Sequence, residues 1–193
     1  MLDQLRFLVS ITRSRSIMRR YFVVNGFDGA LAMLGLTMGF RISDAELPVA
    51  ITACVSTAIA LAVSGVSSAF ISESAEREKE LRELEQSMMA DMADTAHGVA
   101  ARLIPLLIAI VNGLAPLLIS LLIISPLWLQ QSGLALPWPA LDVALGTAFV
   151  LIFLLGTFLG QVSGRFWLWS GMRAVLIGAG TALLILALNL PSI

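Results

Sequence analysis

Long apolar runs separated by short polar segments dominate the chain and predict membrane-spanning helices. A helix that crosses a bilayer needs about 20 mostly apolar residues. Five segments reach or approach that length, near 21–42, 47–72, 101–127, 140–162 and 171–190. We therefore expect an all-α, multi-pass integral membrane protein in which 21–193 form one five-helix membrane domain.

Composition supports this prediction. Of the 193 residues, 58% are hydrophobic and only 13% are charged, whereas soluble proteins carry about 25% charged residues. So few charges cannot cover the chain with a water-compatible surface, so lipid must surround much of it. The single cysteine, Cys54, lies in an apolar run and cannot form a disulfide within the chain.

The distribution of Lys and Arg predicts the orientation, because basic residues concentrate in cytoplasmic segments. With five spans, only Arg41 falls on one side, and all other basic residues fall on the other: Arg6, Arg13, Arg15, Arg19, Arg20, Arg77, Lys79, Arg82, Arg102, Arg165 and Arg173. The N-terminus is therefore expected in the cytoplasm and the C-terminus outside. Residues 1–20 alternate apolar with basic positions and predict an amphipathic helix on the inner leaflet; the alternative is a disordered arm.

Residues 73–98 form the one substantial water-soluble segment. The segment has no proline and contains only strong or moderate helix formers through Met92. We expect it to continue the second span as one long helix into the cytoplasm, turn, and return as the third span.

A carboxylate inside the first span is the main functional candidate. A charge near the bilayer centre costs at least about 2.5–3.5 kcal/mol and usually faces protein. Asp28 lies between Gly26 and Gly29, with Asn25 one turn before it and Met33 further along. These residues are candidates for an ion path; the alternative for Asp28 is a protonated carboxyl hydrogen-bonded between helices.

Two further polar features lie in the apolar segments. Pro116 removes the hydrogen bond to the carbonyl of Asn112, so a free backbone oxygen and an amide are expected together near mid-membrane. Ser64 and Ser68 give the second span a polar face, for an entry path or for close packing. Small residues at four-residue spacing in the fourth span favour tight helix contact, within or between subunits: Gly156, Gly160 and Gly164.

Four glutamates share one face of the water-soluble segment: Glu73, Glu76, Glu80 and Glu83. Like charges on one helix face repel, so the stripe invites a divalent cation, and Met88 and Met89 beyond it favour Fe²⁺ or Mn²⁺ over Ca²⁺. The alternative is a solvated face neutralised by three pairs, Glu73–Arg77, Glu78–Arg82 and Lys79–Glu83. In that alternative, Glu76 and Glu80 have no evident partner four residues on.

Several segments together resemble the vacuolar iron transporter family. RRYFVVNGFDGALAMLGLTMGF is similar to the first helix of that family, and GVSSAFISESAEREKELRELEQSMM to its second helix and Glu-rich segment. PLLIAIVNGLAPLL and SGMRAVLIGAG resemble its third and last helices. The resemblance runs in order from about Arg19 to Leu188, with a Val66 where many members have Glu and with a short cytoplasmic segment, as in a prokaryotic branch.

The resemblance implies a homodimer in the cell membrane that moves Fe²⁺ or Mn²⁺ out of the cytosol in exchange for protons. By position, Asp28 matches the first-helix carboxylate of the path. The Glu-rich helix with Met88 and Met89 matches the metal-collecting segment. Besides the transported ion, lipid and a second copy, no permanent cofactor and no nucleic acid are expected.

Two other classes of protein, a membrane enzyme and a membrane scaffold, are alternatives to a transporter. A membrane enzyme such as a lipid-headgroup transferase would carry several Asp residues at fixed spacing, and no such run or Ser/His pair lies in the apolar segments. An enzyme is therefore not expected. A non-transporting membrane scaffold or assembly subunit, with the charged helix for docking, is the main alternative.

Overall fold

The computed structural model describes residues 14–92 and 94–188, which form five long helices and no strand. The helices are α2 (Ser14–Ile42), α3 (Leu47–Met88), α4 (Ala96–Gln131), α5 (Ala140–Val162) and α6 (Trp167–Leu188). Each is long and apolar enough to cross a membrane. The all-α, five-span prediction is therefore confirmed and indicates a multi-pass membrane protein. Most of the predicted N-terminal arm, residues 1–13, lies outside the described residues.

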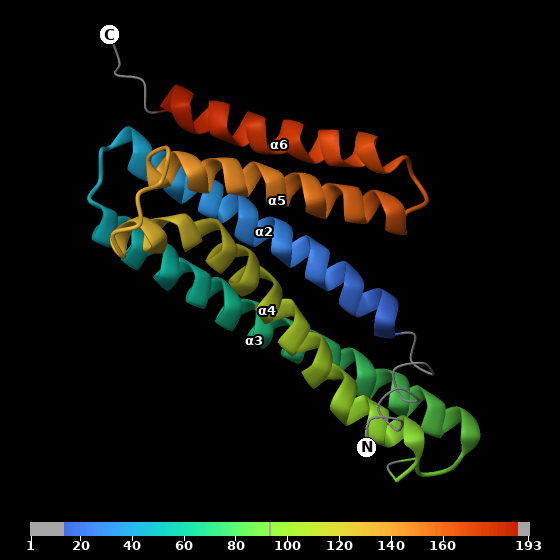
Figure 1. Ribbon diagram of the computed structural model, residues 1–193. Helices are drawn as coiled ribbons and strands as arrows, with labels where there is room; N and C mark the ends of the chain where they lie inside the picture. The colour runs from blue at the N-terminus through green and yellow to red at the C-terminus, as the bar shows by residue number, and fades with distance from the viewer. Residues whose placement is uncertain (1–13, 93, 189–193) are drawn as a thin grey trace.

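The five helices form an up-and-down bundle (Figure 1). Connections of a few residues join successive helices, which forces neighbours to run antiparallel. α2 occupies a central position and packs against all four other helices. The α3–α4 hairpin projects past the other helices at the end where α2 begins, and we call this the hairpin end of the bundle (Figure 1).

α3 runs unbroken from the apolar segment through the charged one, as predicted. Its 42 residues give a length of about 63 Å, roughly twice the thickness of a bilayer's hydrocarbon core. The helix ends at Met88 rather than Met92, because Met89 adopts a left-handed conformation with φ of 50°. α4 then starts after Thr95, whose hydroxyl accepts a hydrogen bond from the Gly98 amide at 3.4 Å.

The core lies between α2, α4 and α5, with a contribution from α3. α4 supplies the largest share, although it contains three prolines. The largest side chains of this cluster with no solvent exposure are Met33, Leu34, Ile123, Ile124, Leu127 and Ile152. Many other core positions are alanine, which lets the helix backbones come close together.

Of the predicted stripe of small residues, Gly156 and Gly160 contribute to close packing between helices of the same chain. A Cβ added to Gly156 would lie 2.5 Å from the Cβ of Ala174, and one added to Gly160 would lie 2.6 Å from that of Ser170. Both glycines therefore pack α5 against α6 within the chain. Gly164 does not continue the stripe, because it lies in the turn after α5 with φ of 66°.

Candidate functional site

A buried amide pair joins α2, α3 and α4 in the middle of the bundle. Asn112 on α4 is 3% exposed, and its amide nitrogen donates to the Gly65 carbonyl oxygen on α3 at 2.8 Å. Asn25 on α2 donates to the side-chain oxygen of Asn112 and to the Tyr21 carbonyl, the latter at 3.2 Å. Both asparagines were candidates from the sequence, but their pairing was not predicted.

Asp28 is exposed on the outer face of α2. It lies 12 residues after Ser16 and 14 before Ile42, near the middle of this candidate span. Its carboxylate forms no hydrogen bond or ion pair with any other described residue. The expectation that it faces protein is therefore wrong within a single chain. The helical period explains this, because every buried position of α2 except Gly29 falls on the opposite face: Val23, Gly26, Ala30, Met33, Leu34 and Thr37.

The other predicted path residues do not line a common cavity within one chain. Met33 is fully buried in the hydrophobic core and lies on the opposite side of α2 from Asp28. Ser64 and Ser68 are exposed on α3. Ser68 donates to the carbonyl of Gly65 at 3.3 Å, so this carbonyl accepts from both Ser68 and Asn112.

Of the four predicted glutamates, Glu73 is the buried one. Its side chain is on α3 and accepts a hydrogen bond from the Tyr21 hydroxyl of α2 at 3.1 Å. Arg77 lies 4.0 Å from Glu73 and 2.7 Å from Glu80 between guanidinium and carboxylate atoms. The Arg77 side chain is only 11% exposed, and its Nε has no hydrogen-bond partner among the described residues. Arg77 is therefore the centre of this cluster rather than a flanking charge.

The remaining charges of α3 agree with the alternative of a solvated helix face that is neutralised by ion pairs. All three predicted pairs are present, including Lys79–Glu83 at 3.8 Å. Glu80 has no partner four residues on, as expected, but it pairs with Arg77, which lies three residues before it. Glu76 is exposed and has no ion pair within 14–92 and 94–188.

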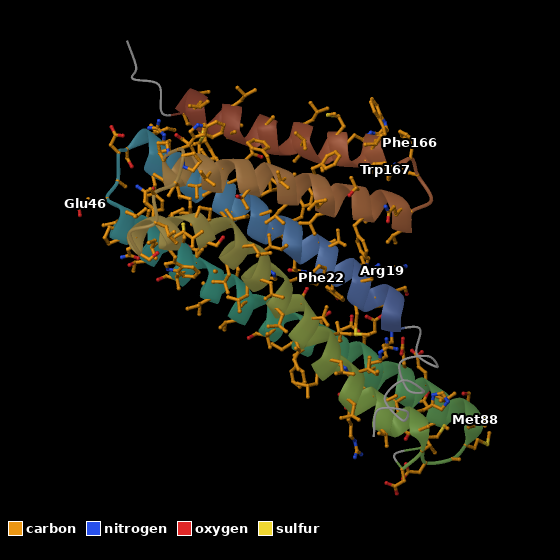
Figure 2. The ribbon with its side chains drawn as sticks, in the orientation of Figure 1. Arg19, Phe22, Glu46, Met88, Phe166 and Trp167 are labelled. Atoms are coloured by element: carbon orange, nitrogen blue, oxygen red, sulfur yellow. The ribbon has the colours of Figure 1, made fainter. Side chains whose placement is uncertain are left out.

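The methionines predicted to assist metal capture are exposed, Met88 by 63% and Met89 by 94%. Figure 2 shows Met88 at the tip of the hairpin. Across the described part of the chain, no three His, Cys, Asp or Glu side chains are grouped so that they could hold a metal ion. The acidic face is therefore not a preassembled metal site within one chain.

Two residues of these networks were missed from the sequence. Tyr21 was taken only as part of the first span, although its hydroxyl ties α2 to Glu73. Arg77 was identified only as a helix pair, although its spacing of four from Glu73 and three to Glu80 allows both contacts. The contacts of Arg77 could have been predicted from its spacing in the sequence, whereas the contact of Tyr21 depends on how α2 packs.

An ion pair joins α2 to α5 at the end of the bundle opposite the hairpin end. Arg41 at the end of α2 contacts Asp142 in the first turn of α5 at 2.8 Å. Gln130 of α4 accepts a hydrogen bond from the Ala140 amide at 2.7 Å, which caps α5. Asp142 therefore joins α5 to the end of α2.

Comparisons with known proteins give one informative relative. The chain is 27% identical over 168 residues to an uncharacterised protein of Methanocaldococcus jannaschii, and the match covers 86% of this chain and 85% of that protein. No family model matches the chain, and no solved structure matches it. The similarity extends along nearly the whole length, so the archaeal protein is similar to the whole membrane domain rather than to one segment of it.

Proposed function

We propose that the protein is a homodimeric transporter of divalent metal ions, which moves Fe²⁺ or Mn²⁺ out of the cytosol in exchange for protons. The observation that carries this proposal is the exposure of Asp28 in the middle of α2. The proposed orientation has the N-terminus and the α3–α4 hairpin in the cytoplasm. It rests on the eleven basic residues on that side against Arg41 on the other.

The exposed carboxylate supports a dimer because lipid is a poor environment for it. A charge facing hydrocarbon costs at least about 2.5–3.5 kcal/mol, and a second copy packed on the same face of α2 removes that contact. A two-fold axis that runs beside Asp28 would bring the Asp28 side chains of both chains together. Two Asp28 side chains would then offer oxygen ligands to a divalent ion, and their repulsion favours a bound proton or metal over the empty, doubly charged state.

The acidic face of α3 supports a role in collecting the ion. Glu76 is free of ion pairs within the described residues, and Glu83 makes only an exposed contact to Lys79. Exposed ion pairs contribute about 0–1 kcal/mol, so an arriving cation can displace the lysine. Glu73 is different, because burial and two partners hold it in place; we assign it to positioning α2 against α3 rather than to first capture.

Flux measurements with a matched carboxylate variant test the proposal. Purified protein in liposomes should carry Mn²⁺ and Fe²⁺ faster when a proton gradient drives protons in the direction opposite to the metal flux. Asp28→Asn should reduce this flux at least tenfold, because the amide cannot exchange a proton for a metal ion. Asp142→Asn, which removes the carboxylate at the far end of the bundle, should keep most of it. Equal flux in Asp28→Asn and wild type would exclude Asp28 from the mechanism.

The ion pairs of α3 favour one other candidate function, a membrane scaffold with a cytoplasmic docking helix. Three of the four striped glutamates contact a Lys or Arg, which is typical of a solvated helix face. Titration calorimetry with Mn²⁺, Fe²⁺, Co²⁺ and Zn²⁺ separates the two. A transporter predicts saturable heat that Glu76→Gln and Glu83→Gln weaken together, whereas a scaffold predicts none.

A further inference from the structure

A cavity between α2 and α5 at the hairpin end combines positive charge with apolar walls. It has a volume of about 290 Å³. Arg19 and Arg20 of α2 line it, and its apolar wall comes from both helices. The full lining is Ser16, Ile17, Arg19, Arg20, Val23, Leu159, Val162 and Ser163.

The two arginines supply charge that the protein does not neutralise. Both are exposed, and neither has a carboxylate partner anywhere in 14–92 and 94–188. Arg20 places its guanidinium 5.9 Å from the ring centre of Tyr21, and this ring supplies no net counter-charge. The hydroxyl of Ser163 already donates to the Leu159 carbonyl at 2.8 Å, so anion binding falls to the arginines. No acidic residue lines the cavity.

The aromatic side chains of the same end place the cavity at the level of lipid headgroups. Phe166, Trp167 and Trp169 are 67%, 44% and 58% exposed around the start of α6. Figure 2 shows Arg19, Phe166 and Trp167 at the same end of the bundle. Exposed Trp side chains at helix ends mark the interface between hydrocarbon and water. At this level Leu159 and Val162 face the part of the acyl chains that is nearest the headgroups.

We propose that this cavity binds one anionic phospholipid, with its phosphodiester between Arg19 and Arg20 and its acyl chains along Leu159 and Val162. Basic pockets between membrane helices favour such headgroups. The guanidinium fork matches phosphate oxygens. Small-molecule pockets begin at about 300 Å³, so a headgroup fits while the acyl chains stay in the bilayer. A choline headgroup would bring a cation towards two guanidinium groups and is disfavoured.

Lipid binding to the purified full-length protein tests the proposal by native mass spectrometry and fluorescence titration in detergent. Phosphatidylglycerol and phosphatidylcholine with identical acyl chains are compared. We expect saturable binding of about one phosphatidylglycerol per chain and weaker binding of phosphatidylcholine. The double variant Arg19→Gln/Arg20→Gln should bind phosphatidylglycerol roughly 30-fold more weakly, at about 1 kcal/mol for each arginine.

The matched control removes two charges at the same end but outside the cavity. Arg102→Gln/Arg165→Gln should bind phosphatidylglycerol within about threefold of wild type, because diffuse surface charge is screened. Leu159→Trp keeps all charges and fills the cavity, and it should weaken binding at least tenfold. Melting curves of all variants establish that they are folded. Because charge removal at Arg19 and Arg20 and cavity filling at position 159 are independent changes, the test still holds if one of these variants does not fold.

Three results would overturn the proposal. Equal binding of the two lipids would show that the arginines do not select charge. An equal loss in the control double variant would show that general surface charge attracts the lipid. Soluble glycerol 3-phosphate binding as tightly as phosphatidylglycerol would make the ligand a free phosphate, whereas weak competition by it supports the lipid.

Discussion

At the scale of single residues, polar side chains fix how α2 and α4 meet α3. Asn112 is buried in the middle of an apolar helix, and its amide satisfies the Gly65 carbonyl as well as Asn25. Near the hairpin end, the Tyr21 hydroxyl reaches across to Glu73. Leucine-rich surfaces can slide past one another, whereas such directional bonds hold only in one register. We regard these residues as the determinants of how the three helices align.

Replacing Asn112 by leucine tests this role. Asn112→Leu keeps the branched shape of the side chain but removes the hydrogen bonds from Asn25 and to the Gly65 carbonyl. We expect a loss of about 1–2 kcal/mol in the free energy of unfolding, since two hydrogen bonds between helices are lost and each contributes modestly in a membrane protein. Unfolding with SDS in mixed micelles measures it. Ser125→Ala, whose hydroxyl bonds only within α4, is the control and should change stability by less than about 0.5 kcal/mol.

At the scale of helices, close packing at glycines joins α6 to the rest of the bundle. α6 contacts mainly α5 and, less extensively, α2. Gly156 and Gly160 of α5 allow this contact, since any Cβ there would overlap α6. Few residues of α6 itself are buried. The position of this last helix therefore depends on a small area of tight contact.

A larger side chain at Gly160 should displace α6. We expect Gly160→Leu to destabilise the protein by about 2 kcal/mol or more, because overpacking a tight contact costs about 1–3 kcal/mol. Gly146→Leu on the same helix is the matched control, since nothing lies within 4 Å of a Cβ there. Thermal unfolding in detergent compares the two. Equal melting temperatures would contradict a tight α5–α6 contact at this glycine.

The helices were predictable from the sequence because length and apolarity alone decide them. The span predicted at 140–162 matches α5 (Ala140–Val162) at both ends, and α3 continues unbroken, as expected from the absence of proline and glycine in 73–92. Helix ends were less predictable. α2 begins seven residues before 21, because an arginine-rich turn can remain helical at a headgroup interface where hydropathy falls.

The site was predictable only in part, because composition does not fix which face of a helix is buried. Asp28 was correctly identified as unusual, yet its side of α2 depends on the packing of α4 and α5. Met33 was placed near it by distance along the chain, although five residues turn it to the opposite face. The pairing of Glu80 with Arg77 needed only the three-residue spacing, which helices permit as readily as four.

At the scale of the whole molecule, the outer face of α2 carries Arg20, Val24 and Asp28 in successive turns. This face is where a second copy would have to pack if Asp28 is to leave lipid. Val24 is 50% exposed and lies one turn from Asp28. The same face begins beside the lipid cavity, so the proposed dimer and the proposed lipid site are neighbours.

Disulfide cross-linking tests the dimer directly. With the lone cysteine removed by Cys54→Ala, Val24→Cys should form a covalent dimer in membranes on mild oxidation, because a two-fold axis beside Asp28 also brings position 24 of both chains together. Leu184→Cys on α6, which is 62% exposed in a single chain, is the control and should stay monomeric. A dimer through position 184 and none through position 24 would place the interface on the wrong helix for the proposed mechanism.

The uninterrupted length of α3 has a mechanical consequence. A rod of about 63 Å that pivots near its midpoint by 10° moves each end by about 5 Å, in opposite directions. Since α3 has no hinge between its charged and apolar halves, a pull on the glutamate-bearing tip is transmitted as an equal and opposite swing of its far end near Leu47. In the orientation proposed above, such a rigid α3 would couple an event in water at the hairpin to a displacement on the other side of the bilayer.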